Sequence, residues 1–214
     1  MAPCGPRPVQ LRFATGHTSE DYVSRQAWRD ASLPRCPRHP HGGCGFARHG
    51  TYARKSPPGT RISRWYCRKA HQTFSLLPDC LAARLSGTLP ALEAVVRAVE
   101  QASSLEVAAD RLRPHIELPG AVRWTRRRVQ GVARALSALR GLAPERFAAC
   151  APTLAAFEAE VGRTPVLVAL RAVAAAYLMH LPAPFGLCPR LPPGGEPSRR
   201  VQHTPGPDPP RAAR

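Results

Sequence analysis

Cysteine and histidine residues gather in two short stretches whose donor atoms could bind a metal ion. Cys36, His39 and Cys44 lie in the first stretch, and Cys67 and His71 lie in the second. Thiolate sulfur and imidazole nitrogen are donors that Zn²⁺ binds in tetrahedral sites. The three residues between Cys67 and His71 suit a turn. We therefore predict a zinc site, with Zn²⁺ as the cofactor, formed by Cys36, Cys44, Cys67 and His71.

The choice between Cys44 and His39 stays open at this point. His39 follows Cys36 with the tighter spacing, whereas seven residues separate Cys36 from Cys44. Gly45 directly follows Cys44, and glycine lets the chain turn sharply past a ligand. This favours Cys44 and leaves His39 as the alternative ligand.

The predicted site is structural rather than catalytic. Residues 34–78 contain no Asp or Glu, so no carboxylate there could act as the base of a metal-activated water. The first ten residues lack the apolar segment of an export signal. Thiols would then stay reduced, which favours a metal over disulfides. We expect a cytoplasmic, nucleoid-associated protein without a membrane partner.

A strong positive charge indicates a polyanionic partner. The chain has 31 Lys and Arg against 14 Asp and Glu, a formal net charge of +17. A domain so far from neutrality repels itself unless a partner supplies negative charge, and nucleic acid is the leading candidate. Nine basic residues fall within 34–78. The DNA contacts predicted there are Arg48, Arg54, Lys55, Arg61 and Arg64.

A second basic segment has the outline of a helix-turn-helix over residues 103–130. A short helix is predicted from Ser104 to Leu112. Pro114, Pro119 and Gly120 are interpreted as breaking the chain, and a longer helix is predicted from about Ala121 to Leu142. Spacings of three and four place several arginines on one face of the second helix. A solvated basic face on an ordinary helical bundle is the alternative. The DNA contacts predicted on this helix are Arg123, Arg126, Arg127 and Arg128.

Strands, a turn and helices must position these side chains. Residues 46–52 and 61–66 have strand character, and Ser-Pro-Pro-Gly-Thr at 56–60 predicts the turn of a hairpin. A lone hairpin is too small to be stable, so residues 34–78 are expected to form a zinc-ribbon-like domain held by the metal. Residues 79–187 have helical periodicity. The predicted fold class is α+β, mostly α: a small β-hairpin followed by a helical bundle.

The ends of the chain are expected to carry little structure. Residues 1–33 are predicted to be a poorly structured lead-in with a short helix around 21–30. Residues 188–214 contain eight prolines and are predicted to be a disordered tail. The apolar run 166–181 is interrupted by Arg171 and is too short to span a bilayer. We interpret it as a core helix.

These motifs resemble the N-terminal region of bacterial insertion-sequence transposases. The resemblance lies in Cys-Gly-Phe-Ala-Arg-His-Gly-Thr-Tyr at 44–52, Arg-Trp-Tyr-Cys at 64–67 and Thr-Phe-Ser-Leu-Leu-Pro at 73–78. In that family a zinc ribbon is commonly followed by a helix-turn-helix, and catalysis needs a ribonuclease-H-like domain with three metal-binding acids. Residues 145–214 hold five acids without the alternating strand–helix pattern of such a domain. The resemblance therefore implies a DNA-recognition module without the catalytic domain.

The function predicted from sequence is thus non-enzymatic duplex DNA binding, sequence-directed or general. A partner transposase or self-association is a possible further interaction. The alternatives are a zinc-stapled protein-interaction adaptor and an accessory transposition factor. An enzyme of DNA rearrangement working alone would need a cluster of acids around a divalent metal, which the acid content disfavours.

Overall fold

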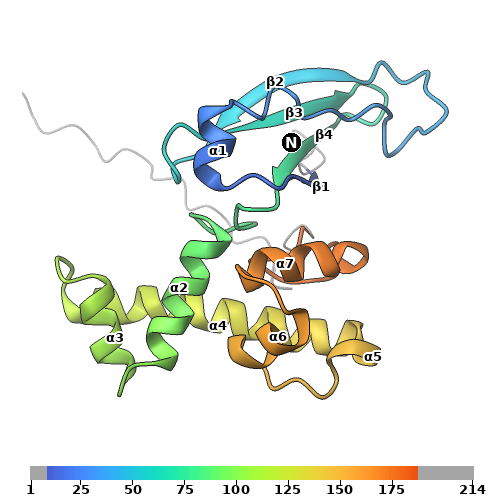
Figure 1. The fold of residues 1–214 in the computed structure, drawn as a ribbon. Coiled ribbons are helices and arrows are strands. Elements are labelled where there is room, and N and C mark those ends of the chain that lie inside the picture. Colours follow the sequence, from blue (N-terminus) through green and yellow to red (C-terminus); the bar gives the residue numbers. More distant parts are fainter. Residues whose placement is uncertain (1–8, 188–214) are drawn as a thin grey trace, which may run out of the picture.

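The computed structural model describes residues 9–187, which form an α+β structure of one sheet over a helical layer (Figure 1). The predicted tail, 188–214, lies outside the described residues. In chain order the elements are β1 (Val9–Phe13), α1 (Ser19–Ser24), β2 (Ala47–Ala53), β3 (Arg61–Cys67), β4 (Gln72–Pro78), α2 (Leu89–Glu100), α3 (Leu105–Leu112), α4 (Leu118–Leu142), α5 (Pro144–Phe147), α6 (Leu154–Val161), α7 (Val166–Val173) and the 3₁₀ turn η1 (Ala175–Tyr177).

The sheet has four strands, in the order β1-β4-β3-β2. The expected hairpin is present as β2 and β3, which pair antiparallel on either side of the proline-rich turn. β4 continues antiparallel from β3, and β1 pairs parallel with β4. The hairpin is therefore half of a larger sheet, which supplies hydrogen-bonding partners that a lone hairpin lacks.

Residues 1–33 are not a poorly structured lead-in where the structure describes them. They supply β1 and then α1, which Thr18 caps by accepting a hydrogen bond from the Asp21 backbone amide. Tyr22 is fully buried, and its hydroxyl donates to the Arg61 carbonyl at 3.0 Å. Trp28 is also buried and packs with Tyr22. These aromatic side chains cover one face of the sheet, which is why the segment is ordered.

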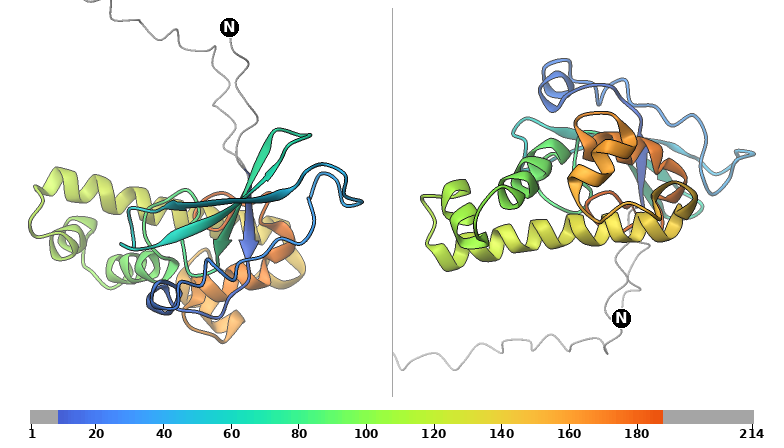
Figure 2. Two further views of the ribbon diagram at one scale, coloured as in Figure 1. Left: turned by 90° about the horizontal axis from the view of Figure 1, so that it is seen from above. Right: turned by 60° about the horizontal axis from the view of Figure 1, so that its bottom comes forward.

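The helical periodicity of α2 is confirmed. Its apolar residues Leu89, Leu92, Val95 and Val96 are buried, and Thr88 caps the helix by accepting from the Ala91 amide. α2 and α7 lie beneath the sheet in Figure 1, and the right view of Figure 2 shows the long α4 spanning the helical layer from α3 to α5. Among residues 9–187, no helix combines the length and apolar character that crossing a bilayer requires.

α4 begins earlier than the sequence indicated. The helix was expected from about residue 121, because Pro119 and Gly120 were interpreted as breakers. It starts at Leu118 instead, with Pro119 in its first turn. Proline fits there because amides of the first turn have no acceptor within the helix. The turn between α3 and α4 is correspondingly short, residues 113–117.

Sheet and helices share one apolar core, so residues 34–78 are not a separate unit. Ile62 of β3 and Leu77 of β4 belong to the same buried cluster as Leu136 of α4 and Leu170 of α7. The prediction that the apolar run 166–181 belongs to the core is confirmed, because its residues Leu167, Leu170, Leu178 and Leu181 are buried.

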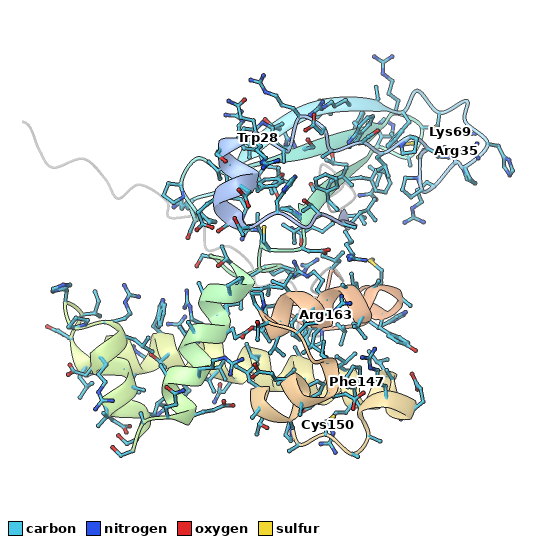
Figure 3. All side chains as sticks on the ribbon, in the orientation of Figure 1. Trp28, Arg35, Lys69, Phe147, Cys150 and Arg163 are labelled. Carbon is cyan, nitrogen blue, oxygen red and sulfur yellow. The ribbon has the colours of Figure 1, made fainter. Side chains whose placement is uncertain are left out.

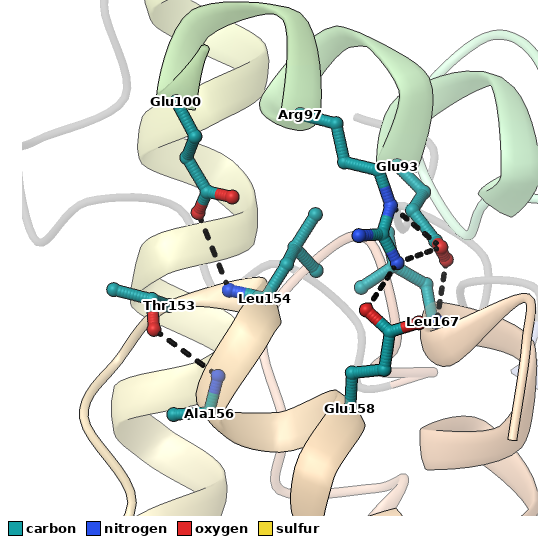
Figure 4. Close-up of polar contacts among 8 residues, drawn as sticks. All are labelled: Glu93, Arg97, Glu100, Thr153, Leu154, Ala156, Glu158 and Leu167. Carbon is teal, nitrogen blue, oxygen red and sulfur yellow. Dashed lines mark hydrogen bonds and ion pairs between the residues drawn. The ribbon is translucent and has the colours of Figure 1, made fainter. Parts of the chain in front are cut away.

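A polar network joins α2 to the helices that follow α4 (Figure 4). The Arg97 guanidinium bridges Glu93 at 2.9 Å and Glu158 at 2.8 Å. The second oxygen of Glu93 accepts from the Leu167 backbone amide at 3.0 Å. Glu93 is buried, so this network satisfies a carboxylate that would otherwise be costly to bury.

Arg171 of α7 is the largest fully buried side chain and ties the two layers together. Its guanidinium donates to the backbone carbonyls of Pro78, Asp79 and Leu81. It also donates to Pro184 and Phe185 near the end of the described chain. Burial lowers the pKa of Arg171 to about 10, so the group stays charged at neutral pH.

Replacing Arg171 by methionine should strongly destabilise the fold. The carbonyls that it satisfies would remain buried without a donor, which costs on the order of 3 kcal/mol or more. Urea unfolding monitored by circular dichroism measures the loss. The control is Arg163→Met, since Arg163 is exposed and lies three residues before the start of α7 (Figure 3). Equal stability of the two variants would contradict the role given to Arg171.

Candidate metal centre and basic surface

Three cysteines and one histidine converge at the end of the sheet. The donor atoms of Cys36, His39, Cys44 and Cys67 all lie within 4.8 Å of one another. His39 Nδ1 is 3.6 Å from the Cys36 sulfur and 3.3 Å from the Cys67 sulfur. Ligand atoms bound tetrahedrally at the usual zinc distances are separated by about 3.5–3.8 Å. The cluster therefore has the donors and the spacing to hold a metal ion.

Two loops deliver these ligands. Residues 36–45 form a projecting loop in which Cys36 and His39 make an isolated antiparallel bridge, and the Lys69 amide donates to the Cys44 carbonyl at 3.3 Å. Cys67 ends β3, and its sulfur accepts from the Ala70 amide at 3.4 Å. Figure 3 places Arg35 and Lys69 together at this end of the sheet.

Gly45 makes the sharp turn after Cys44 that the sequence predicted. Its φ is +63°, a left-handed conformation that side chains disfavour. A Cβ there would also meet the Arg68 side chain at 3.1 Å. Glycine thus lets the loop pass close to the β3–β4 turn.

The cluster is buried against aromatic side chains. Cys36, Cys44 and Cys67 are 3%, 4% and 0% exposed, and they pack with Phe74 of β4. Phe46 stacks on Trp65 and lies edge-on to Phe74. These rings form an aromatic wall beside the three thiols, an apolar shell of the kind that limits solvent access to a metal site.

The predicted ligand set differs from the observed cluster at one position. His39, the alternative, is in the cluster, whereas His71 lies outside it and places its Nδ1 3.2 Å from the Tyr66 hydroxyl. Adjacent residues of a strand point to opposite faces, so Tyr66 and Cys67 diverge. The chain reverses directly after Cys67 and pairs this residue with Gln72 of β4. His71, which precedes Gln72, therefore lies on the side of Tyr66 rather than on that of Cys67.

The thiols of the cluster differ in acidity. Burial raises the pKa of Cys36, but hydrogen bonds from the His39 side chain and from backbone amides outweigh it and bring the pKa down to about 7. Burial and the neighbouring Cys67 and Cys36 thiols raise the pKa of Cys44. Cys36 is thus ready to bind as a thiolate near neutral pH, whereas Cys44 must release a proton.

The predicted DNA contacts of the sheet separate into two groups. Arg48 donates to the carbonyls of Trp28 at 2.7 Å and Arg29 at 2.9 Å, and Arg54 donates to those of Ala82 and Leu85. These two guanidinium groups serve the fold. Lys55 and Arg61 are exposed, and Arg64 is half-buried against the Tyr52 ring.

The arginines predicted on the second helix lie near the start of α4. Arg123, Arg126 and Arg127 are exposed, opposite the face that buries Ala121, Thr125 and Val132. Arg128 is half-buried, and its guanidinium lies 3.7 Å from the centre of the Trp124 ring. The sequence did not single out Trp124 or Arg113, which approaches the same ring at 4.8 Å.

Metal content tests the ligand assignment. We expect the protein to bind one divalent ion, and His39→Ala or Cys44→Ser to lower its retention at least tenfold, because three ligands remain. His71→Ala should keep the full metal content. Elemental analysis after dialysis against a weak chelator gives the stoichiometry. Metal loss in His71→Ala but not in His39→Ala would reverse the assignment.

Metal binding should also release protons at about pH 7, because the raised pKa of Cys44 keeps that thiol protonated in the metal-free protein. The release should shrink near pH 9, where more of the thiols are already ionised. Calorimetric titration with zinc in two buffers of different ionisation enthalpy measures it. A heat that is independent of the buffer at the lower pH would contradict this.

Comparisons with known proteins add no family or relative to this geometry. No protein-family model, curated protein or solved structure matches the chain. The resemblance to insertion-sequence transposases therefore stays a prediction from the motifs. The convergence of Cys36, His39, Cys44 and Cys67 rests on the structure itself.

Proposed function

We propose that this chain is a non-enzymatic DNA-binding protein in which a Zn²⁺ ion holds the end of the sheet and the start of α4 contacts the duplex. The observation that carries the proposal is the charge of α4. Its 25 residues include six arginines and no acid. Within residues 9–187, the four ion pairs involve only Arg12, Arg97 and Arg146.

The exposed arginines of α4 therefore have no ion-pair partner among residues 9–187. Arg123 is separated from Arg126 and Arg127 by three and four positions, so the three side chains share one face of the helix. Neutralising such a face with phosphates releases counterions from the nucleic acid, which favours binding. α3 packs directly against this part of α4, as the first helix of a helix-turn-helix would.

Trp124 supports the same surface. The Arg113 and Arg128 guanidinium groups lie 4.8 Å and 3.7 Å from its ring centre. Burial lowers the pKa of Arg128, and the charges of Arg113 and Arg127 lower it further. Like charges held this close are costly unless the ring and an external anion compensate them. We infer that DNA phosphate is that anion.

The sheet contributes less of the DNA surface than its sequence indicated. Arg48 and Arg54 are occupied with backbone carbonyls, so they are assigned to the fold. Lys55 and Arg61 remain available to contact the phosphate backbone. The proposed DNA-binding set is therefore Lys55, Arg61, Arg123, Arg126, Arg127 and Arg128.

Zinc is the metal that the donor set favours. Three thiolates and one imidazole form a closed tetrahedral set that is typical of structural zinc. Residues 34–78 contain no carboxylate, so the site offers no general base. In this proposal the ion fixes loop 36–45 and takes no part in a reaction.

Two pairs of substitutions test the DNA surface. Arg126→Gln with Arg127→Gln should weaken duplex binding at least tenfold and reduce the slope of log affinity against log salt by about 2, roughly one for each lost phosphate contact. The control, Arg25→Gln with Arg163→Gln, removes the same charge from exposed sites elsewhere. Fluorescence anisotropy of a labelled duplex at several salt concentrations measures both.

Equal weakening by the two pairs would show that net charge alone is responsible. No measurable duplex binding by the unaltered protein at low salt would end the proposal. Either result is independent of whether the Cys–His cluster binds zinc.

A further inference from the structure

A polar pocket lies on the face of the sheet that the metal cluster does not use. It has a volume of about 370 Å³ and is lined by Gln10, Tyr52, Arg64, Thr73, Ser75 and Arg84. All four strands contribute to it, and Arg84 comes from the connection between β4 and α2. The lining contains two guanidinium groups and no carboxylate.

Strand register explains why these side chains meet. Ser75 of β4 lies opposite Gln10 of β1 and opposite Arg64 of β3, and residues directly opposite in a sheet point to the same face. Thr73 is two positions before Ser75 and therefore shares that face. Tyr52 lies opposite Ile62, two positions before Arg64. The pocket is thus a product of regular pairing across the sheet.

Two buried polar atoms of the pocket lack partners. Among the described residues, neither Arg64 Nε nor Gln10 Oε1 has a hydrogen-bond partner. Arg64 Nε needs an acceptor, whereas Gln10 Oε1 needs a donor. Buried polar atoms are normally satisfied, so a ligand that offers both an anionic acceptor and a donor fits this pair.

The chemistry of the lining favours a phosphate monoester. Such a group carries about −1.5 to −2 charges at neutral pH, which matches two guanidinium groups better than a carboxylate does. The hydroxyls of Ser75 and Thr73 offer further donors. The volume lies in the range of small-molecule sites and exceeds what a phosphate group alone would fill. The Tyr52 ring adds an aromatic surface to the lining, with its centre 5.8 Å from the Arg64 guanidinium, so a phosphate on Arg64 would bring an attached base beside this ring.

We infer that this pocket binds a nucleoside monophosphate unit, with the phosphate on Arg64 and Ser75 and the nucleoside toward Tyr52 and Gln10. Arg84 adds positive charge beside the phosphate, while its guanidinium donates to the Leu187 carbonyl at 3.1 Å. The unit can be a free nucleotide or the phosphorylated end of a strand, which share this chemistry. The inference does not depend on duplex binding through α4, because it concerns a terminal phosphate and a different part of the molecule.

Titrations of the full chain separate the two sources. The free probes are the four nucleoside 5′-monophosphates, with the matching nucleosides and inorganic phosphate as comparisons. The strand probe is a single-stranded oligonucleotide with a 5′-phosphate, and its comparison is the same oligonucleotide with a 5′-hydroxyl. Isothermal calorimetry measures the free probes, and fluorescence anisotropy measures the oligonucleotides.

At least one phosphorylated probe should bind tenfold or more tightly than its unphosphorylated counterpart and than inorganic phosphate. A preference confined to the oligonucleotide identifies a strand end, and a preference among the free probes identifies a nucleotide. Absence of any such preference in both arms would overturn the inference. Inorganic phosphate binding as tightly as the phosphorylated probe that binds best would do the same.

Substitutions place the binding in this pocket. Arg64→Gln should reduce the preference for the phosphorylated probe at least tenfold. The control is Arg25→Gln, because Arg25 is exposed and belongs neither to this pocket nor to the proposed DNA-binding set. A thermal melt shows whether Arg64→Gln is folded at the temperature of the binding assay. Ser75→Ala is a smaller change that should lower the preference several-fold, and it serves as the test if Arg64→Gln does not fold. Unchanged preference in Ser75→Ala and in folded Arg64→Gln, or an equal loss in Arg25→Gln, would refute the assignment.

Discussion

The convergence of three thiols and one imidazole is the constraint on which the outer end of the sheet depends. The helical layer anchors the sheet near Ile62 and Leu77, but the opposite end has its own small cluster, in which three of the four buried residues are cysteines. Thiols buried in contact without a metal gain little from one another, and burial together with the neighbouring thiols raises the pKa of Cys44. A cation held by these four residues would turn this arrangement into a stabilising one, and in the proposed function it fixes the loop 36–45 relative to the β3–β4 turn.

Arginine serves two purposes in this protein, and the distinction lies in what each guanidinium contacts. Arg48, Arg54 and Arg171 donate to backbone carbonyls at places where the chain changes direction. These contacts stabilise a structure rich in loops, since several donors in one planar group can satisfy carbonyls from two segments at once. Arg126 and Arg127 are instead exposed on a helix without acids. Net charge alone therefore overstates the binding surface, and the proposal for DNA rests on the second group.

Most of the secondary structure could be predicted locally, and the errors have a common cause. The β2–β3 hairpin followed from its turn residues, and α2 followed from its apolar spacing. The prediction of a poorly structured lead-in was wrong, because β1 is a short strand whose stability comes from pairing with β4, more than sixty residues away. The predicted start of α4 was wrong because Pro119 was interpreted as a breaker. Proline breaks a helix in its interior but fits its first turn. In each case the deciding contact or position was not visible in the local pattern.

By itself the sequence determined the kinds of donor available to a metal, their grouping on either side of a hairpin, and the excess of arginine over acid. These follow from composition and spacing alone. Tertiary structure decided which histidine joins the cysteines: β3 directs Tyr66 and Cys67 to opposite faces, so His71 turns to Tyr66 while the loop 36–45 brings His39 to Cys67. Tertiary structure also decided which arginines face solvent and which meet in a pocket, because only strand pairing brings Gln10, Arg64 and Ser75 into one row.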